Sequence, residues 1–286
     1  MNLLITGITG NFGYAVYRQL AGRGDLRLFA GARNPERVNF LLDDPEIESR
    51  RFDFNEPETF GSVLRDIDTV ILLRPPALTE VRRYVPPFVE ACREGGVEHI
   101  VFLSIQGVEN NRRLPHYKIE RYIEQSGIPY TFLRPGFFME NLITTHRDEI
   151  RYRSKLIVPA GEGRTNFIAV GDVAAAAAAC VGKPEHYRRA YELTGPEAYD
   201  YYQVAEILSQ ELGRPVRYEN PSRWEFFRYR RSLGDPIPFV IVMILLYRRV
   251  KKGGAEARNE NLQRVFEVEP QLLRNFIREK LDYLRE

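Results

Sequence analysis

The chain has 286 residues with a hydrophobic fraction of 44%, enough to bury the core of one large domain or two smaller ones. A formal net charge of +2 gives no electrostatic reason to expect nucleic acid or acidic lipid as a partner, and the basic clusters "RRSL" and "YRRVKK" are interpreted as solvated surface. The two cysteines, Cys92 and Cys180, lie in apolar helical patterns without paired spacing, so neither a metal site nor a disulfide framework is expected.

The amino terminus and the cysteine usage together indicate a cellular compartment. A strand pattern begins at Asn2, which leaves no room for a signal peptide, and unpaired cysteines fit a reducing environment. We therefore expect a cytoplasmic protein. One apolar run, 236–247, has about half of the ~20 residues that a membrane span needs, so it predicts a buried or groove-lining helix and no membrane span.

The first half of the chain alternates between strand and helix patterns. Short, nearly continuous apolar runs predict strands at 3–6, 26–32, 48–53, 69–73, 99–104 and 130–134. Helical periodicity lies between them, at 12–20, 85–92 and 119–123. This alternation predicts an α/β fold with a Rossmann-type, doubly wound parallel sheet.

The second half of the chain has a different pattern, without an internal repeat or a Gly-, Pro- or Ser-rich linker. It predicts a helix at 140–151, a strand and turn at 155–163, a helix at 170–182 capped by Asp172, a strand at 190–195, a helix at 201–213 closed by Gly213, a strand at 216–219, and a helix that starts at a Ser222–Glu225 capping box. We therefore expect a cofactor-binding Rossmann domain at 1–150 and a smaller α/β substrate or lid lobe at 151–286, interleaved with the first domain rather than independent.

A glycine-rich turn lies between the first strand and the first helix. Gly7, Gly10 and Gly13 give Gly-x-x-Gly-x-x-Gly in "LLITGITGNFG". A dinucleotide pyrophosphate sits on the free N–H groups of such a helix start, and a side chain on the turn would block its approach. The position at the first strand–helix junction favours phosphate binding over the alternative, a plain tight turn.

The end of the second strand indicates which dinucleotide is preferred. An NAD site would place an acid there to hold the ribose 2′-hydroxyl, but the sequence "AGARNPER" has Arg33 at that point, with Arg37 one helical turn later. A guanidinium can pair with a 2′-phosphate, so NADP(H) is expected, with NAD(H) left open. The alternative for Arg33 is an exposed charge. Asp53 closes the third predicted strand and either accepts from the adenine amino group or caps the next turn or helix.

These features, together with "FLSIQGV", "HYKIERYIEQSGIPYTFLRPGFFMENL" and "VGDVAAAA", resemble the NmrA-like family of atypical short-chain dehydrogenases/reductases. The resemblance covers residues 1 to about 220 and is strongest in the block 116–142. Members of this family include NADPH-dependent quinone reductases, a triphenylmethane-dye reductase and redox-sensing regulators that bind NADP(H). The resemblance implies a Rossmann fold with the cofactor along the carboxyl edge of the strands and a small carboxyl-terminal lobe over the nicotinamide.

The resemblance also implies cofactor-binding residues, because this sequence matches the family at those positions. Lys118 would hydrogen-bond the nicotinamide ribose, and the loop 135–138 would contact the nicotinamide. The implied cofactor contacts are Gly7, Thr9, Gly10, Asn11, Phe12 and Gly13 at the turn, Arg33, Asp53 and Phe54 toward the adenosine, Leu72, Leu73 and Arg74 after the fourth strand, and Lys118, Pro135, Gly136, Phe137 and Phe138 at the nicotinamide.

The sequence departs from the family of typical short-chain dehydrogenases at the catalytic tyrosine. In their Tyr-x-x-x-Lys motif, the lysine lowers the pKa of a tyrosine that gives a proton to the substrate oxygen. Counting back from Lys118 reaches Leu114, which cannot do this. A literal match, Tyr247 to Lys251, lies in the carboxyl-terminal segment and is interpreted as chance.

The missing tyrosine favours acceptors that need no strong acid. Hydride transfer to a ketone forms a basic alkoxide, whereas transfer to a quinone spreads the new charge through an aromatic ring. Phe137, Phe138 and Met139 are candidates for the wall of a flat apolar pocket, with core packing as the alternative. The polar candidates near the nicotinamide are Gln106, His116 and Tyr117, for which a structural role is the alternative. No catalytic residue is assigned.

Two functional hypotheses therefore remain open. The first is an NADPH-dependent oxidoreductase that reduces a quinone-like or other conjugated small molecule. The second is a non-catalytic NADP(H)-sensing regulatory protein that binds a protein partner. The sequence names neither the acceptor nor the oligomeric state, and a homodimer is one of the arrangements it allows.

Overall fold

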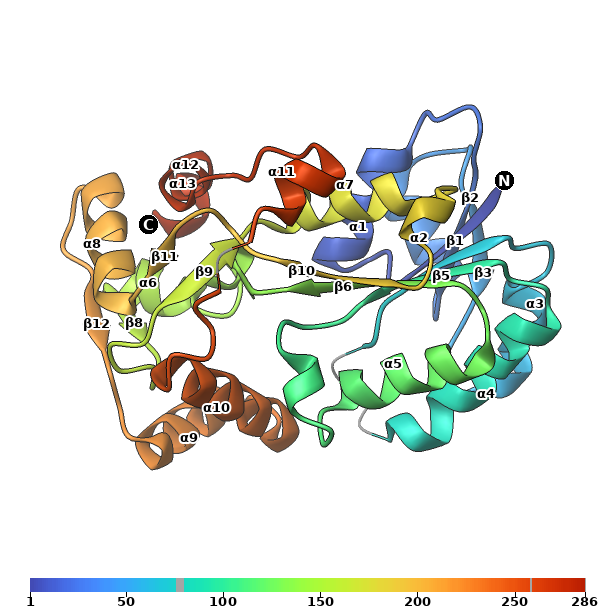
Figure 1. Ribbon diagram of the computed structural model, residues 1–286. Coiled ribbons are helices and arrows are strands. Elements are labelled where there is room, and N and C mark those ends of the chain that lie inside the picture. The colour runs from blue at the N-terminus through green and yellow to red at the C-terminus, as the bar shows by residue number, and fades with distance from the viewer. Residues whose placement is uncertain (76–79, 258, 286) are drawn as a thin grey trace. The chain divides into compact units, whose positions relative to one another are not determined.

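The computed structural model describes residues 1–75, 80–257 and 259–285, drawn in Figure 1. They form two compact units. The first contains Met1–Pro135 and Val173–Glu192, and the second contains Gly136–Asp172 and Leu193–Glu286. The chain first crosses between units after Pro135, and it returns to the first unit once.

The first unit is built on a seven-stranded sheet with the strand order β10-β6-β5-β4-β1-β2-β3. The strands are β1 (Asn2–Thr6), β2 (Arg27–Ala32), β3 (Glu48–Arg51), β4 (Thr69–Leu72), β5 (His99–Leu103), β6 (Tyr130–Pro135) and β10 (Arg189–Leu193). From β1 to β6 the pairing is parallel, with Leu4 beside Phe29 on one side and Val70 on the other. The strand order reverses at β1 and β4, which confirms the predicted Rossmann-type sheet.

Helices cover both faces of this sheet (Figure 1). They are α1 (Asn11–Leu20), α2 (Pro35–Leu42), α3 (Phe60–Val63), α4 (Val81–Glu94), α5 (Pro115–Ser126) and, from Val173 onward, α7 (Val170–Cys180), with 3-10 turns at η1 (Pro57–Thr59), η2 (Val108–Asn110) and η4 (Pro184–His186). On one face, Phe88 of α4 and Ile123 of α5 pack against Phe29 and Phe102 in one apolar cluster. Cys92 and Cys180 are buried free thiols.

The second unit has two small sheets and a helical cover. Its elements are β7 (Phe137–Phe138), η3 (Met139–Leu142), α6 (Arg147–Arg153), β8 (Lys155–Ile157), β9 (Thr165–Ile168), β11 (Ala198–Tyr199), α8 (Tyr201–Leu212), β12 (Arg217–Glu219), α9 (Arg223–Ser232), α10 (Ile237–Lys251), α11 (Asn261–Phe266), α12 (Leu273–Glu279) and α13 (Leu281–Leu284). The sheets are β11-β9-β7 and β12-β8. Phe167, Tyr201, Phe226 and Phe276 are buried in its core.

Three sequence predictions for this half need correction. The helix predicted at 140–151 is broken, because η3 ends at Leu142 and α6 begins only at Arg147. The strand predicted at 190–195 is β10, which joins the sheet of the first unit. Asp172 lies in the first turn of α7 rather than at its cap, and the Val170 N–H is instead bonded by a distant carboxylate, Glu140. By contrast, Gly213 and the Ser222 capping box end and begin their helices as predicted.

The apolar run 236–247 forms most of α10. Val240, Met243, Tyr247 and Val250 face the core of the second unit, as a buried helix requires. The opposite face is exposed, so the prediction of a buried or groove-lining helix describes only one of its two faces. Of the helices that the structure describes, none combines the length and the apolar character needed to cross a membrane.

Candidate functional site

A pocket of about 500 Å³ opens at the carboxyl ends of β1 to β4 in the first unit. This edge, next to the reversal of strand order, is where doubly wound sheets bind their ligands. Eight residues predicted from sequence line it: Gly7, Thr9, Gly10, Arg33, Asp53, Phe54, Leu73 and Arg74. The other lining residues are Thr6, Gly31, Ala32, Phe52, Asn55, Pro75, Glu80 and Tyr84.

The three glycines of the turn have three different physical roles. Gly7 has φ +64°, a left-handed conformation that favours glycine. A Cβ on Gly13 would lie 2.4 Å from the Gly7 carbonyl oxygen and 2.8 Å from the Ile8 Cα, so α1 can pack on the turn only without a side chain there. Gly10 has φ −91°, which any residue adopts, and a Cβ there would meet only the Gly7 oxygen, at 3.3 Å. Of the three, only Gly10 has neither a left-handed backbone conformation nor a severe clash between a Cβ and backbone atoms. Gly10 also lines the pocket.

The start of α1 offers hydrogen-bond donors to this pocket. The first N–H groups of an α-helix have no partner within the helix, and its amino end carries a partial positive charge. Gly10 is the N-cap residue and provides no side-chain cap, while the first turn contains no acid. A phosphate bound here would meet these donors, and the open side of Gly10 leaves room for it. The turn therefore fits a dinucleotide pyrophosphate.

The end of β2 is basic. Arg33 is exposed and lines the pocket, whereas Arg51 of the neighbouring strand is paired with Glu56 at 2.7 Å. The nearest acid of the predicted set, Asp53, accepts hydrogen bonds at Oδ1 from the backbone and side-chain nitrogens of Asn55, at 2.9 and 3.0 Å. These bonds form a turn, the alternative that the sequence left open for Asp53, and the residue lines the pocket.

Buried polar groups lie near the ends of β4 and β5. Burial lowers the pKa of Arg74, and burial together with the Arg74 charge lowers the pKa of His116 to about 3, so this imidazole is neutral at physiological pH. Within the described part of the chain, no hydrogen-bond partner faces His116 Nδ1 or the hydroxyl of Ser104, the residue after β5. Such orphaned polar atoms at the ligand edge are what a bound polar molecule would satisfy.

The remaining predicted residues of the first unit do not line the pocket. Lys118 and Tyr117 are half-buried in the first turn of α5, and the backbone N–H of Lys118 donates to the Leu114 carbonyl at 3.4 Å. Leu114 is the N-cap residue of α5, so the position of the missing tyrosine carries an apolar side chain. Gln106 is buried, and its backbone N–H donates to the Pro135 carbonyl. Asn11, Phe12 and Leu72 belong to α1 and β4.

The predicted nicotinamide loop divides between the units. Pro135 ends β6 in the first unit, while Gly136, Phe137 and Phe138 begin the second, where β7 pairs in parallel with β9. Met139 is 1% exposed and packs in the core of the second unit, which matches the core-packing alternative.

Tyr247 belongs to a buried polar cluster in the second unit, and its partner there is not Lys251. The Tyr247 hydroxyl is 2.8 Å from His146 Nε2, and His146 Nδ1 is 3.0 Å from the Glu149 carboxylate. Arg230 bonds the other oxygen of Glu149 at 3.1 Å. Burial raises the pKa of Glu149, but the bond to His146 and the charge of Arg230 outweigh it and the pKa is lowered. The cluster neutralises its own charges, as a structural network does.

Sequence reasoning missed several residues of the pocket and its surroundings. Thr6 is buried, and its Oγ1 donates to the Ile71 carbonyl and accepts from the Leu73 N–H at 2.9 Å, which ties β1 to the end of β4. Gly31 leaves space between Leu4 and Phe52. Ser104 could have been found, because it is a polar residue at the end of an apolar strand. Tyr84 carries no such signal.

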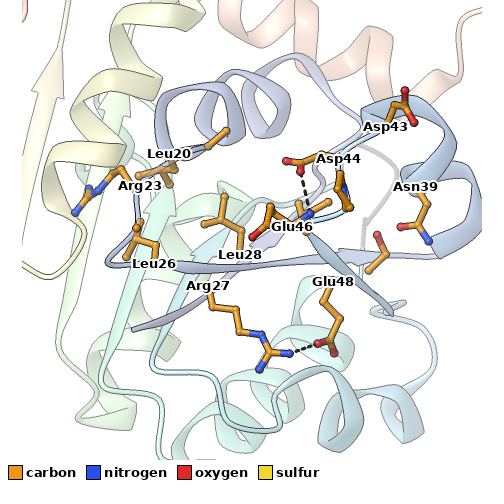
Figure 2. Close-up of a pocket in the computed structure, with 16 residues that line it drawn as sticks. Leu20, Arg23, Leu26, Arg27, Leu28, Asn39, Asp43, Asp44, Glu46 and Glu48 are labelled. Atoms are coloured by element: carbon orange, nitrogen blue, oxygen red, sulfur yellow. Dashed lines mark hydrogen bonds and ion pairs between the residues drawn. The ribbon is translucent and has the colours of Figure 1, made fainter.

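A larger depression lies at the opposite edge of the sheet (Figure 2). It has a volume of about 1160 Å³ and is formed by the end of α1 and the amino ends of β2 and β3. Several of its charged groups have partners within the fold: Arg27 pairs with Glu48 at 2.9 Å, and Asp44 accepts from the Glu46 backbone N–H. Ligands of doubly wound sheets bind at the carboxyl ends instead, so we assign no site here.

The fold and the glycine-turn pocket define a Rossmann-type dinucleotide-binding protein. The chain belongs to the NmrA-like family, whose model matches residues 1–275. It is similar to the NAD(P)H azoreductase of Xenophilus azovorans, with 32% identity over 222 residues and 76% of each chain covered. Prestalk A differentiation protein A of Dictyostelium discoideum is 29% identical over 239 residues, 82% of this chain and 78% of that protein. The crystal structure of an NADPH-dependent quinone oxidoreductase from Escherichia coli matches with a TM-score of 0.85 and 25% identity, covering 98% of this chain and 99% of the other. The family thus includes NAD(P)H-dependent oxidoreductases.

Proposed function

We propose that this protein binds NADPH in the first-unit pocket and reduces a quinone-like or otherwise conjugated small molecule. The observation that carries the proposal is the donor set of the pocket. An uncapped helix start, a glycine with an open side and an exposed arginine meet at the ligand edge of a Rossmann sheet. The names of the azoreductase and quinone oxidoreductase relatives give the class of acceptor.

Each part of the site has a role in binding. The backbone N–H groups at the start of α1 would hold the pyrophosphate, and Arg33 would pair with the 2′-phosphate. Asp53 and Phe54 would border the adenosine, together with Leu73 and Arg74. Lys118 and the loop 135–138 would orient the nicotinamide ribose and ring. The bound cofactor supplies the hydride.

The proposed acceptor class rests on the side chains that could donate a proton to the substrate. Leu114 occupies the place of the catalytic tyrosine, and His116 is neutral at physiological pH because burial lowers its pKa. The Tyr247 hydroxyl is bonded within the second-unit cluster, and burial raises its pKa further. A ketone needs a strong proton donor or an oxyanion site, whereas a quinone delocalises the charge that it receives. Correct placement beside the cofactor is then the main contribution of the chain.

The test is oxidation of NADPH by a panel of acceptors, followed by absorbance of the reduced nicotinamide. The panel contains benzoquinones, naphthoquinones, an azo dye, a triphenylmethane dye and, as controls, simple ketones and aldehydes. We expect turnover with conjugated acceptors and none with the controls. Gly10→Val serves as the matched inactive variant.

The same experiment separates the reductase from the NADP(H) sensor. A sensor binds NADPH, seen as a change in nicotinamide fluorescence, but no acceptor in the panel oxidises it. That result would contradict the proposed reductase. Preferential turnover of ketones would contradict the acceptor class alone and would point to a proton donor elsewhere in the chain.

A further inference from the structure

The outer side of α9 and α10 carries the largest cluster of exposed apolar side chains in the second unit as described. Trp224 is 65% exposed, Ile241 48% and Leu245 47%. We call this surface the α9–α10 face and define it by Trp224, Leu233, Ile237, Ile241, Val242 and Leu245. Trp224 stacks on Phe227 at 5.7 Å between ring centroids, and both line an open groove with Ile244, which joins the two helices into one surface.

Helical spacing makes the α10 part of this face continuous. Ile237, Ile241 and Leu245 follow one another at intervals of four, so they lie along one side of the helix. The opposite side is occupied by the buried residues Val240, Met243, Tyr247 and Val250. A helix in water that packs on one side normally has polar residues on the other. This helix is apolar on both, and only one of the two is covered.

The face is bordered by positive charge. Residues 222–252 contain eight basic and two acidic side chains, although the whole chain has a net charge of only +2. Both acids are engaged locally, Glu225 by the Ser222 capping box and Asp235 by the buried Arg230. Arg223, Arg228 and Arg231 are exposed on α9. On α10 the apolar stripe runs directly into Arg248, three residues after Leu245.

We infer that the α9–α10 face binds the surface of an anionic lipid bilayer. A helix that lies in the interface buries its apolar side at the level of the acyl boundary, while basic side chains reach the headgroups. An exposed tryptophan at the border also suits the headgroup region. Anionic headgroups complement the positive border, and each basic residue near the surface adds attraction.

Charge also decides against a second copy of this chain as the occupant. A symmetric dimer through this face would bring one positively charged border against another. Like charges facing each other oppose association, whereas a bilayer rich in anionic lipid neutralises them. The inference is independent of the proposed catalytic activity, because it uses no residue of the cofactor pocket.

The experiment is flotation of the full chain with unilamellar vesicles, one set of phosphatidylcholine and one containing phosphatidylglycerol. We expect binding to the anionic vesicles at least about tenfold tighter than to the neutral ones, and loss of most of it when the salt rises from about 0.1 to about 0.5 M. The double variant Ile241→Glu and Leu245→Glu should bind at least about tenfold more weakly, because it removes apolar area and adds repulsion.

Matched controls separate this surface from general stickiness. Phe40→Glu with Leu41→Glu changes two exposed apolar residues of α2, 85% and 52% exposed, and should float like the wild type. Arg231→Glu with Arg248→Glu should weaken binding, whereas Arg112→Glu with Arg113→Glu in the first unit should not. Circular dichroism verifies that each variant is folded. If the charge-reversed Arg231→Glu and Arg248→Glu variant does not fold, Arg248→Gln tests the same charge with a milder change and should also weaken binding.

Three outcomes would overturn the inference. They are no flotation with anionic vesicles, equal flotation with neutral vesicles, or unchanged flotation of the Ile241→Glu and Leu245→Glu variant. A dimer in sedimentation velocity that this variant abolishes, without vesicle binding by the wild type, would identify a second copy as the occupant.

Discussion

The helices α1 and α7 begin in opposite ways. α1 starts at a glycine turn, with Gly10 as an N-cap residue that has no side chain and with no acid in the first turn. At α7, both carboxylate oxygens of Glu140 lie 3.0 Å from the Val170 nitrogen, and Asp172 adds a second carboxylate in the first turn. Both helix starts carry a partial positive charge, but of the two only α7 has carboxyl groups placed against it by the chain.

The difference teaches how to distinguish a ligand site from a structural one. At α7 the carboxyl groups are half-buried, and desolvation raises the pKa of Glu140 to about 7 and that of Asp172 to about 6. The Glu149 cluster follows the same plan, because Arg230 and His146 occupy its carboxylate. At α1 the donors stay open beside a pocket. Polar groups that the fold satisfies internally indicate structure, and those left open indicate a ligand.

The largest expected effect is the loss of stability when the ion pairs of Arg230 in the second unit are removed. Arg230→Met leaves Glu149 and Asp235 without their guanidinium, one of them deeply buried, and should lower the free energy of unfolding by about 3–5 kcal/mol. Urea denaturation measures this change. Arg228→Met, on an exposed position of the same helix, is the control and should stay within about 0.5 kcal/mol of wild type. An equal, small effect of both would mean that the cluster does not hold the second unit together.

Two glycine substitutions at the start of α1, one at position 13 and one at position 10, should have different effects. Gly13→Ala places its Cβ 2.4 Å from the Gly7 carbonyl oxygen, so it should lower the free energy of unfolding by about 3 kcal/mol. Gly10→Val places its Cβ 3.3 Å from the Gly7 carbonyl oxygen, so it should cost less stability than Gly13→Ala. It should weaken NADPH and NADH at least about 100-fold, because its methyl groups would enter the proposed phosphate path. Thermal melts and fluorescence titration separate the two. Tight binding by a folded Gly10→Val variant would reduce the motif to a turn.

Glu140, whose carboxyl group bonds the start of α7, should make the free energy of unfolding depend on pH. The pKa of Glu140 rises from an ordinary 4.5 to about 7 on folding, so the native state keeps a proton that the unfolded chain releases. Stability contributed by protonated Glu140 is therefore present below about 4.5 and lost as the pH rises to about 7, by roughly 2–3 kcal/mol. Glu140→Gln should remove this slope. The measurement is urea denaturation of both proteins at several pH values, and identical slopes would contradict the assignment.

Arg33 should determine the preference of the first-unit pocket for NADPH over NADH. Arg33→Ala is expected to weaken NADPH by roughly 10- to 100-fold and NADH hardly at all, because a charge-assisted pair with a phosphate contributes about 1.5–3 kcal/mol. Fluorescence titration of both nucleotides measures the ratio. Arg37→Ala, one helical turn later on α2, is the matched control. Equal weakening of both nucleotides by Arg33→Ala would show that this arginine does not contact the 2′-phosphate.

The smallest expected effect concerns the hydroxyl of Tyr247. Tyr247→Phe removes one bond to His146 and should cost about 1 kcal/mol of stability. Turnover of an accepted quinone should fall less than about tenfold, because the hydroxyl serves the cluster rather than the substrate. Tyr152→Phe, at an exposed position of α6, is the control. A fall of about 1000-fold with unchanged NADPH binding would make Tyr247 the missing proton donor.

Local sequence patterns predicted the glycine turn and the strands of the first unit well, but they did not predict the polar contacts of the second unit. The glycine turn, the six parallel strands and the Gly213 and Ser222 helix ends depend on neighbours within a few residues, so the sequence shows them directly. The counter-charges of the second unit come from far along the chain. Glu140 is 30 residues from Val170, and His146 is 101 residues from Tyr247. No spacing rule links such pairs, so the sequence indicates a chance motif at Tyr247 and does not reveal its contact with His146.

The same limit explains the misplaced helix and strand. Residues 140–151 have a helical pattern, but Glu140 is drawn to Val170 and the Thr144 hydroxyl donates to the Glu140 carbonyl, so the helix starts again only at Arg147. The short strand at 189–193, which contains an arginine and a glutamate, does not reveal from its own sequence which sheet it joins. Its place beside β6 is decided by tertiary pairing.

The contact between Gly13 and Gly7 has an evolutionary consequence. A side chain at position 13 collides with backbone atoms, so folding itself excludes substitution there, whatever the protein does. At position 10 the backbone conformation suits any residue, and the nearest atom to a Cβ would be the Gly7 oxygen at 3.3 Å, so the fold constrains this position less than position 13. If the pocket binds a nucleotide as proposed, a descendant that no longer used the nucleotide could lose Gly10 while still keeping Gly13. On that proposal, the identity of residue 10 in a descendant with an intact Gly13 would indicate whether the cofactor is still bound.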